Sequence, residues 1–497
     1  MLERAIHLDP DACYQALIAH DARFDGAFFV GVKTTGVYCR PVCRARTPGR
    51  DRCLFFQRAA VAEQAGFRAC FRCRPERAPG QSSVDAVSRL VGSAMRKIDE
   101  GALNESSVDD LATSLGVGSR HLRRVMQDEL GVGPLELALS RRIAIARELL
   151  LGTSLPITEV AFASGFSSVR RFNAAYRAHQ GMTPTDVRRP IDRAGSETRS
   201  VLRLVLDIRS PFDSDLAFSF LRARSVKGNE AFIGRAYLKA VALAGSNGEV
   251  RTGILTMAPA KGRDAIIVDA SSALAPALMT IASRVRNLFD SDANLLQIAQ
   301  HLSRDPILKS RVRARPALRV MGALDPFEWA IRAVLGQQVS VRAALTIASR
   351  LVERFGIPVA SDLEGAPTHA WPDAQRLADV PNESLAALGL TKARAKTVHE
   401  ISRAVAEGRV VLDRSADPET LMQALLAVPG VGPWTADYIA MRALAWPDAF
   451  PSGDLGLRKA LGGISAKELE ERAERWRPWR AYAAAHLWMG LSEETGT

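Results

Sequence analysis

The chain of 497 residues has no apolar run of 18 residues, and it holds only six cysteines. The missing apolar run excludes a membrane-spanning helix, and so few thiols exclude a disulfide-stabilised extracellular scaffold. The first residues include Glu3, Arg4 and His7, a pattern that predicts no signal peptide. We therefore expect a cytoplasmic protein with no membrane partner.

Acidic residues are also scarce relative to basic ones. Lys and Arg number 66 against 54 Asp and Glu, for a formal net charge of +12. Between Arg40 and Arg77 there are ten arginines and three acids. Arginine suits forked hydrogen bonds to phosphate, so this balance predicts a polyanionic partner. We expect double-stranded DNA, and hence association with the nucleoid.

Four of the six cysteines form two close pairs near the N-terminus. Cys39 and Cys43 enclose three residues, and Cys70 and Cys73 enclose two. Two short loops with four thiolates are typical of a tetrahedral zinc site. Spacing alone favours a closed structural site, but a thiolate is also a nucleophile. Cys13 and Cys53 lie outside the pairs, and we expect them to be ordinary buried thiols.

The residues around these pairs resemble the N-terminal domain of the Ada methyl-acceptor family. The resemblance covers about residues 5–78 and rests on Phe28 to Arg46 and Ala65 to Pro75. It implies one zinc ion held by four cysteines. It also implies that Cys39 accepts a methyl group irreversibly from a DNA methylphosphotriester. Arg44 and Arg46 are candidate DNA contacts. The four ligands implied are Cys39, Cys43, Cys70 and Cys73.

A helical segment follows, with two helix-turn-helix patterns. Ser107 and Asp110 form a capping box, and Ser119 is expected to cap the next helix. The pattern recurs from Ile157, and the segment 84–189 resembles the AraC-type DNA-binding domain. Recognition helices of this kind enter the major groove. The arginine candidates for DNA contact are Arg120, Arg123, Arg124, Arg170 and Arg171.

The C-terminal half contains a second reactive pattern. Pro429 to Gly432 reads as a hairpin between two helices, in which Gly430 and Gly432 let backbone N–H groups approach a phosphate. About 20 residues later, Asp454 follows a glycine turn at an expected helix start. An Asp at such a place is usually only an N-cap. Its spacing from the hairpin is typical of a helix-hairpin-helix glycosylase.

Residues 201–494 resemble AlkA, the inducible 3-methyladenine DNA glycosylase. The resemblance rests on Asp325 to Arg342, Leu388 to Ala395 and Glu474 to Trp488 as well as the hairpin. It implies that Asp454 stabilises the positive sugar as an alkylated purine leaves. Trp434, Tyr438 and Trp488 resemble the aromatic residues of the flipped-base pocket.

Two positions in this half modify the expected chemistry. Trp434 stands where related enzymes that also cut the backbone have a lysine, which predicts a monofunctional glycosylase that forms no Schiff base. Gln338 replaces the apolar leucine at the DNA-wedging position after Gln337, so both glutamines are candidate DNA contacts. No cysteine follows Cys73, so the second methyl acceptor of some Ada proteins is missing.

The predicted fold is multidomain α+β and mostly α. We expect a zinc methyl-acceptor domain at 1–80, an all-α DNA-binding domain at 84–189 and a linker at 190–200. A mixed-sheet lobe at 201–288, with strands from Val201, Gly248 and Asp264, then precedes a helix-hairpin-helix domain at 289–497.

The resulting hypothesis is a monomeric alkylation-response protein that joins methyl transfer, transcription activation and base excision. Zinc is its expected metal, with no organic cofactor, and RNA polymerase is an expected partner. Two alternatives stay open. In one, a transcription regulator has a C-terminal half that binds damage without catalysis. In the other, a glycosylase has a purely structural zinc domain.

Overall fold

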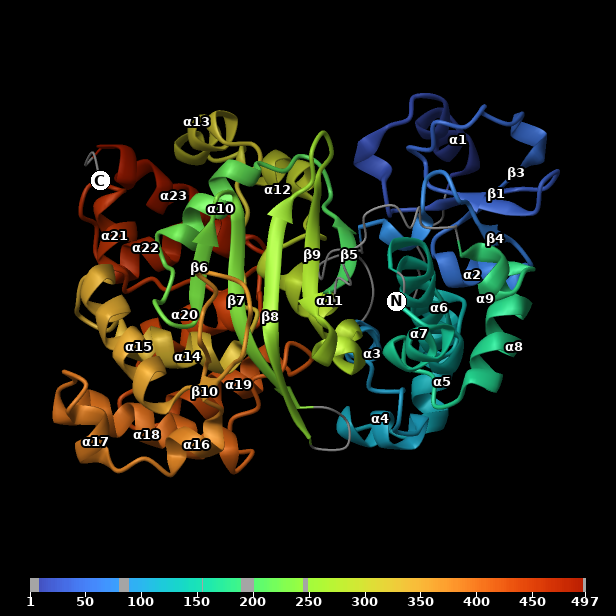
Figure 1. Cartoon of the computed structure of the whole chain (residues 1–497). Coiled ribbons are helices and arrows are strands. Elements are labelled where there is room, and N and C mark those ends of the chain that lie inside the picture. Colours follow the sequence, from blue (N-terminus) through green and yellow to red (C-terminus); the bar gives the residue numbers. More distant parts are fainter. Residues whose placement is uncertain (1–8, 80–88, 154, 189–200, 245–248, 495–497) are drawn as a thin grey trace. The chain divides into compact units, whose positions relative to one another are not determined.

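The computed structural model describes residues 9–79, 89–153, 155–188, 201–244 and 249–494 (Figure 1). The predicted linker at 190–200 lies outside these ranges. The chain forms two compact units. One comprises 1–210, 243–251 and 257–283, and the other comprises 211–242, 252–256 and 284–497. Among the described residues, no helix is both long enough and apolar enough to cross a membrane.

The first unit begins with a small sheet of strand order β3-β1-β2-β4. β1 pairs antiparallel with β2 and β3, and β2 pairs parallel with β4. Phe28 and Cys13 pack in one small cluster beside this sheet, and Tyr38 packs in another. The elements are α1 (Pro10–Ile18), β1 (Phe29–Val32), β2 (Val37–Cys39), β3 (Cys53–Phe56), α2 (Ala59–Gln64) and β4 (Arg68–Ala69).

Helices make up the next part of this unit, as predicted. The capping box of Ser107 and Asp110 is confirmed at the start of α4. Leu122 and Met126 on one helix and Phe172 on another are fully buried, because helical spacing places apolar side chains on one face of each helix. The helices are α3 (Arg89–Asp99), α4 (Val108–Ser114), α5 (Ser119–Leu130), α6 (Pro134–Gly152), α7 (Ile157–Ala163), α8 (Val169–Gln180) and α9 (Pro184–Val187).

The second sheet has strand order β5-β9-β8-β7-β6. The alternating segments from Val201, Gly248 and Asp264 form β5, β8 and β9, as predicted, whereas β6 and β7 were not predicted. β7 contains Lys239, whose Nζ is 2.8 Å from Glu328 Oε2 and 2.9 Å from Glu230 Oε1. The strands are β5 (Val201–Asp207), β6 (Glu230–Ile233), β7 (Ala236–Ala244), β8 (Val250–Pro259) and β9 (Ala265–Ser271).

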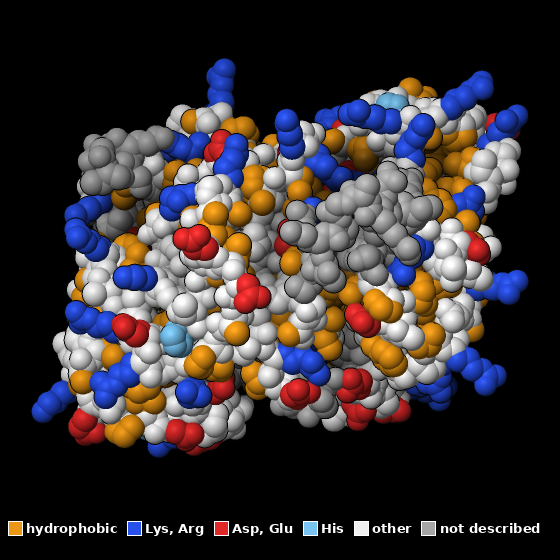
Figure 2. All heavy atoms as spheres, in the orientation of Figure 1, with side chains coloured by type: hydrophobic (Ala, Val, Ile, Leu, Met, Phe, Trp, Pro, Cys, Tyr) orange, Lys and Arg blue, Asp and Glu red, His pale blue; other side chains and the backbone are white. Residues whose placement is uncertain are grey.

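The second unit is otherwise helical, apart from the short pair β10 (Ile357–Pro358) and β11 (His369–Ala370). Most of its helices begin at a side-chain cap, for example Asp325, Thr391 and Asp417. Lys and Arg side chains project from much of the face seen in Figure 2. The helices are α10 (Ser214–Arg222), α11 (Leu278–Leu288), which starts in the first unit, α12 (Leu295–Leu302), α13 (Pro306–Ala314), α14 (Pro326–Leu335), α15 (Val341–Phe355), α16 (Ala374–Ala378), α17 (Asn382–Ala386), α18 (Lys392–Ala406), α19 (Pro418–Leu426), α20 (Pro433–Ala443), α21 (Leu455–Lys459), α22 (Ala466–Ala473) and α23 (Arg480–Glu494).

Candidate functional sites

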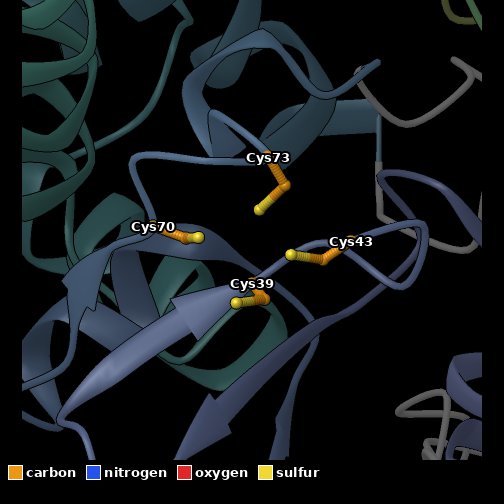
Figure 3. A group of neighbouring side chains, drawn as sticks. All are labelled: Cys39, Cys43, Cys70 and Cys73. Carbon is orange, nitrogen blue, oxygen red and sulfur yellow. The ribbon is translucent and has the colours of Figure 1, made fainter. Parts of the chain in front are cut away.

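The four paired cysteines converge on one point. Cys39 ends β2 and Cys70 follows β4, so the parallel pairing of these strands places the two thiols side by side. The ligand atoms of the four residues all lie within 4.8 Å of one another. Their sulfur atoms turn toward a common centre (Figure 3). Tetrahedral zinc with Zn–S bonds of about 2.3 Å requires sulfur atoms about 3.8 Å apart.

The cluster therefore fits zinc in its donor set and spacing. All four cysteines are free thiols, as are the buried Cys13 and Cys53. The Cys70 backbone N–H donates to the Tyr38 carbonyl at 3.0 Å, which fixes one loop to β2. The Arg40 backbone N–H lies 3.4 Å from Cys73 Sγ and can donate to a thiolate there. Backbone donors of this kind hold the sulfur ligands in place.

The arginines around the cluster divide into two groups. Arg44 and Arg46, the predicted DNA contacts, are both exposed. Arg40 is buried against Asp25, with Nε 2.8 Å from Asp25 Oδ1. Arg74 and Arg77 pair with acids inside the first unit, mainly Glu148 and Glu76. The local arginine excess is therefore only partly available to a polyanion.

The two predicted recognition helices are α5 and α8. All five arginine candidates for DNA contact on them are exposed, namely Arg120, Arg123, Arg124, Arg170 and Arg171. One detail was wrong: Gly118, not Ser119, is the N-cap of α5, and no side chain caps this helix. In α8, by contrast, Ser168 accepts a hydrogen bond from the Arg171 backbone N–H.

In the second unit, Asp454 is the N-cap of α21 and the acceptor of two indole hydrogen bonds. Oδ1 accepts from the Leu457 backbone N–H and from Trp488 Nε1, each at 2.9 Å. Oδ2 accepts from Trp434 Nε1, also at 2.9 Å. Asp454 is thus an N-cap, but the hydrogen bond from Leu457 occupies only one of the acceptor positions of its carboxylate. The indole groups fix the remaining orientation of Asp454 against aromatic rings.

The three aromatic residues predicted for the base pocket lie together in the fold, and their role as a pocket stays a prediction. Trp434 and Tyr438 stack with centroids 5.3 Å apart and planes at 5°. Trp488 meets Tyr438 edge-on at 6.3 Å. The sequence reasoning missed Trp329, whose ring lies 6.5 Å from Tyr438. Its segment belongs to the glycosylase resemblance, but no local pattern marks this ring as a pocket residue.

Two arginines missed by sequence reasoning lie beside Tyr438. The Arg442 guanidinium is 5.6 Å from the Tyr438 ring centroid and 5.8 Å from that of Trp488. Burial alone would raise the pKa of the Tyr438 phenol, but the charges of Arg442 and Arg224 outweigh burial and lower it. Arg442 is four residues after Tyr438 on one helix, a spacing that could have revealed it. Arg224 is distant in sequence and gave no signal.

The predicted hairpin connects α19 to α20 and is exposed at Gly430. Gly430 has φ +87°, and a Cβ there would lie 1.9 Å from Thr397 Oγ1, so only glycine fits. At Gly432 a Cβ would meet nothing within 4 Å. Gly432 is instead the N-cap of α20, where backbone N–H groups are free to bind an anion.

The predicted wedge loop is attached to this hairpin. Gln337 Nε2 lies 3.1 Å from the Gly430 carbonyl and 2.9 Å from Thr435 Oγ1. Arg394 donates to the Gln337 carbonyl. Gln338, at the tip, is exposed and has φ +54°, an uncommon conformation for a residue other than glycine. Gln337 therefore anchors the loop, and the contact of either glutamine with DNA stays a prediction.

Protein families match successive parts of the chain. The metal binding domain of Ada matches residues 12–76, and a helix-turn-helix domain matches residues 111–190. The AlkA N-terminal domain matches residues 203–325. The HhH-GPD superfamily of base excision DNA repair proteins matches residues 331–480.

Individual relatives match either nearly the whole chain or one part of it. The chain is 43% identical over 493 residues to the "Probable bifunctional transcriptional activator/DNA repair enzyme AlkA" of Mycobacterium tuberculosis, covering 98% of this chain and 97% of the relative. It is 32% identical to "DNA-3-methyladenine glycosylase 2" of Escherichia coli, covering 57% of this chain and 95% of that protein. It is 28% identical to "Bifunctional transcriptional activator/DNA repair enzyme AdaA" of Bacillus subtilis, covering 36% and 82%. The chain therefore belongs to the family of bifunctional Ada- and AlkA-type transcriptional activator/DNA repair enzymes.

Proposed function

We propose that the second unit removes N-alkylated purines of the 3-methyladenine type from double-stranded DNA, with Asp454 as its catalytic carboxylate. The observation that carries this proposal is that Asp454 accepts hydrogen bonds from two indole groups of one aromatic cluster. A fixed carboxylate beside the deoxyribose can stabilise positive charge as it develops in the transition state. It needs no reorganisation at the moment of reaction.

The aromatic pocket suits the leaving base. An N-alkylated purine carries positive charge, and a cation is attracted to the electron-rich faces of Trp and Tyr. The bond from C1′ to the base nitrogen breaks, and the base leaves with the bonding electron pair. Water adds its oxygen to C1′ and releases a proton. The products are the free base and an abasic site.

The same pocket supports a monofunctional enzyme. By the resemblance, Trp434 stands where enzymes that also cut the backbone have the amine that attacks C1′. Its Nε1 donates a hydrogen bond to Asp454. Borohydride should therefore trap no covalent complex with damaged DNA, and the abasic strand should remain uncut. A trapped complex with β-elimination would contradict this assignment.

We also propose that the first unit accepts methyl groups from DNA methylphosphotriesters at Cys39. Zinc held by the four cysteines would keep their sulfurs deprotonated and electron-rich. The Cys39 sulfur attacks the methyl carbon, so that a C–S bond forms, the C–O bond breaks and the phosphodiester leaves. The formal charge of the site then changes from −2 to −1, because one thiolate becomes a thioether. Less negative charge beside exposed Arg44 and Arg46 should raise affinity for DNA.

Exposure alone does not choose among the thiols. Cys39 is 9% exposed and Cys73 is half-buried, so the choice of Cys39 rests on its place in the Ada-like segment. Sequence-specific DNA binding by α5 and α8, followed by activation through RNA polymerase, completes the proposal for the first unit. Methylation at Cys39 would then act as the damage signal.

One experiment separates this proposal from the two alternatives. Wild type, Cys39→Ala and Asp454→Asn are incubated with methylated duplex DNA, and released base and protein-bound methyl are measured separately. We expect Cys39→Ala to lose only methyl uptake and Asp454→Asn to lose only base release. No base release by wild type would favour a non-catalytic clamp. Base release without methyl uptake would favour a structural zinc site.

A further inference from the structure

A groove of about 500 Å³ opens beside the start of α15, in the second unit. Its volume falls within the range of about 300–1,000 Å³ that is typical of ligand sites. One wall is the segment that follows α10, and the other wall is the first half of α15. Figure 1 shows where α10 and α15 lie in the chain. The side chains that matter here are Ser225, Lys227, Val341, Arg342, Leu345 and Thr346.

The lining combines positive charge, hydroxyl groups and apolar surface. Lys227 and Arg342 are exposed, and no acidic residue lines the groove. Val341 adds an apolar side chain that is 56% exposed. Cations and the Ser225 hydroxyl suit phosphate oxygens, and apolar side chains suit deoxyribose. The Thr346 hydroxyl instead donates to the Arg342 carbonyl at 3.0 Å. The chemistry therefore matches a nucleic acid backbone.

The position of the groove connects it to the wedge loop. Gln338 lies three residues before Val341, so one wall of the groove continues directly from the wedge tip. The other wall continues from the base pocket. Ser225 and Lys227 line the groove. Arg224, next to Ser225 in the chain, lies close enough to Tyr438 for its charge to lower the pKa of that phenol. The groove and the base pocket thus share a boundary segment.

We infer that this groove binds the sugar–phosphate backbone of the undamaged strand, opposite the flipped nucleotide. The inference rests on the proposed glycosylase function. The hairpin at Gly430 offers an anion site for the damaged strand, and Gln337 attaches the wedge loop to that hairpin. A wedge inserts between two strands. The cationic groove begins three residues after Gln338, on the side of the loop away from Gln337 in the chain. We therefore assign it to the complementary strand.

The test compares DNA with charged and neutral backbones. The probe is a duplex with a tetrahydrofuran abasic-site analogue, in which the phosphates opposite the analogue are replaced by methylphosphonates. Binding of the full chain is measured by fluorescence anisotropy over a range of salt concentrations. The signal used is the gain in affinity over an undamaged duplex of equal length, because this difference removes DNA binding by the first unit.

The double variant Lys227→Gln/Arg342→Gln is the central reagent. For wild type, neutral linkages opposite the lesion should reduce the specific affinity, and the salt slope should fall by about one for each lost contact. The double variant should show a slope lower by about two on ordinary DNA and no further loss on neutral DNA. Arg354→Gln, on the same helix but outside the groove, is the matched control and should behave like wild type.

Two results would overturn the inference. One is equal loss in wild type and the double variant when the opposite strand is neutralised. The other is a loss that appears only when the damaged strand is neutralised. Thermal unfolding of the double variant checks that it is folded. Excision of alkylated purine by wild type is assayed separately, so failure of the glycosylase proposal is distinguishable from failure of the groove.

Discussion

At the scale of single residues, three hydrogen bonds hold the side chain of Asp454. Its two oxygens accept from one backbone N–H and two indole N–H groups, each at 2.9 Å. The sequence pattern predicted Asp454, Trp434 and Trp488 as a set, because the resemblance carried all three. It could not predict that the indole groups bind the carboxylate, since that depends on how α20, α21 and α23 meet.

Trp488→Phe tests this arrangement because it keeps an aromatic ring and removes one donor. We expect kcat for base release to fall about ten- to a hundredfold with a smaller change in KM, since a hydrogen bond to a charged group contributes about 1.5–3 kcal/mol. Trp371→Phe is the control, because the Trp371 indole nitrogen is buried without a hydrogen-bond partner among the described residues. An unchanged kcat in Trp488→Phe would show that the Trp488 hydrogen bond is not needed to position the carboxylate.

Asp437 provides a prediction about pH. Burial raises the pKa of its carboxyl from 3.8 to about 6. The folded state therefore holds its proton more tightly than the unfolded state, so this residue stabilises the fold below pH 3.8 and that contribution is lost as pH rises through about 6.

The free energy of unfolding of the second unit should therefore decrease between these two pH values, by at most about 3 kcal/mol. Urea unfolding followed by tryptophan fluorescence would measure the change. Asp437→Asn should flatten the dependence, whereas Asp362→Asn, at an exposed carboxyl, should leave it intact. The same slope in wild type and Asp437→Asn would contradict the assignment.

At the scale of elements, the predictable parts were those with a local pattern. β5, β8 and β9 alternate and were predicted, but β6 and β7 were not. β7 holds Lys239, and lysine is a residue type that is usually exposed. In the fold it is buried with Glu230 and Glu328, and Glu328 comes from a helix distant in sequence. The local sequence of the strand does not reveal ion-pair partners that come from distant elements. The misplaced cap at Ser119 is a smaller error, of one residue at a helix end.

The hairpin gives a prediction at this scale with a control inside the same element. Gly430→Ala should destabilise the second unit by more than about 1 kcal/mol, because alanine disfavours φ +87° and its Cβ would meet Thr397. Gly432→Ala has open space and an ordinary φ of −96°, so its melting temperature should fall much less than that of Gly430→Ala, by no more than the small cost of alanine at an N-cap. Its added methyl group should still weaken DNA binding. Equal melting temperatures for all three proteins would contradict this account.

At the scale of the whole molecule, the cysteine cluster is the feature that the sequence predicted most completely. The spacing of the cysteines predicted the four ligands, and the structure brings these four residues together. Spacing could not show that Arg40, Arg74 and Arg77 form ion pairs with acidic residues of the same unit. The basic character of the whole chain therefore overstates the charge that the first unit presents to DNA.

Metal content tests the cluster in the intact chain. We expect one zinc per chain in the purified protein, measured by elemental analysis, and strong loss in Cys43→Ser. Cys13→Ser and Cys53→Ser should keep the metal, because both thiols lie outside the cluster. Chelation should lower the melting temperature of wild type, since metal binding contributes to folding. Full zinc in Cys43→Ser would exclude the four-thiolate site.

The left-handed backbone at Gln338 has a consequence for how the protein searches DNA. Gln337, the residue before it, is held by hydrogen bonds to the Gly430 carbonyl and from Arg394. In the proposed function Gln338 is the wedge, and because its loop is held at Gln337 we expect the duplex to supply most of the movement when the two meet. Base pairs that open with least effort would yield first, so sites already loosened by alkylation would stop a sliding molecule more often than intact ones.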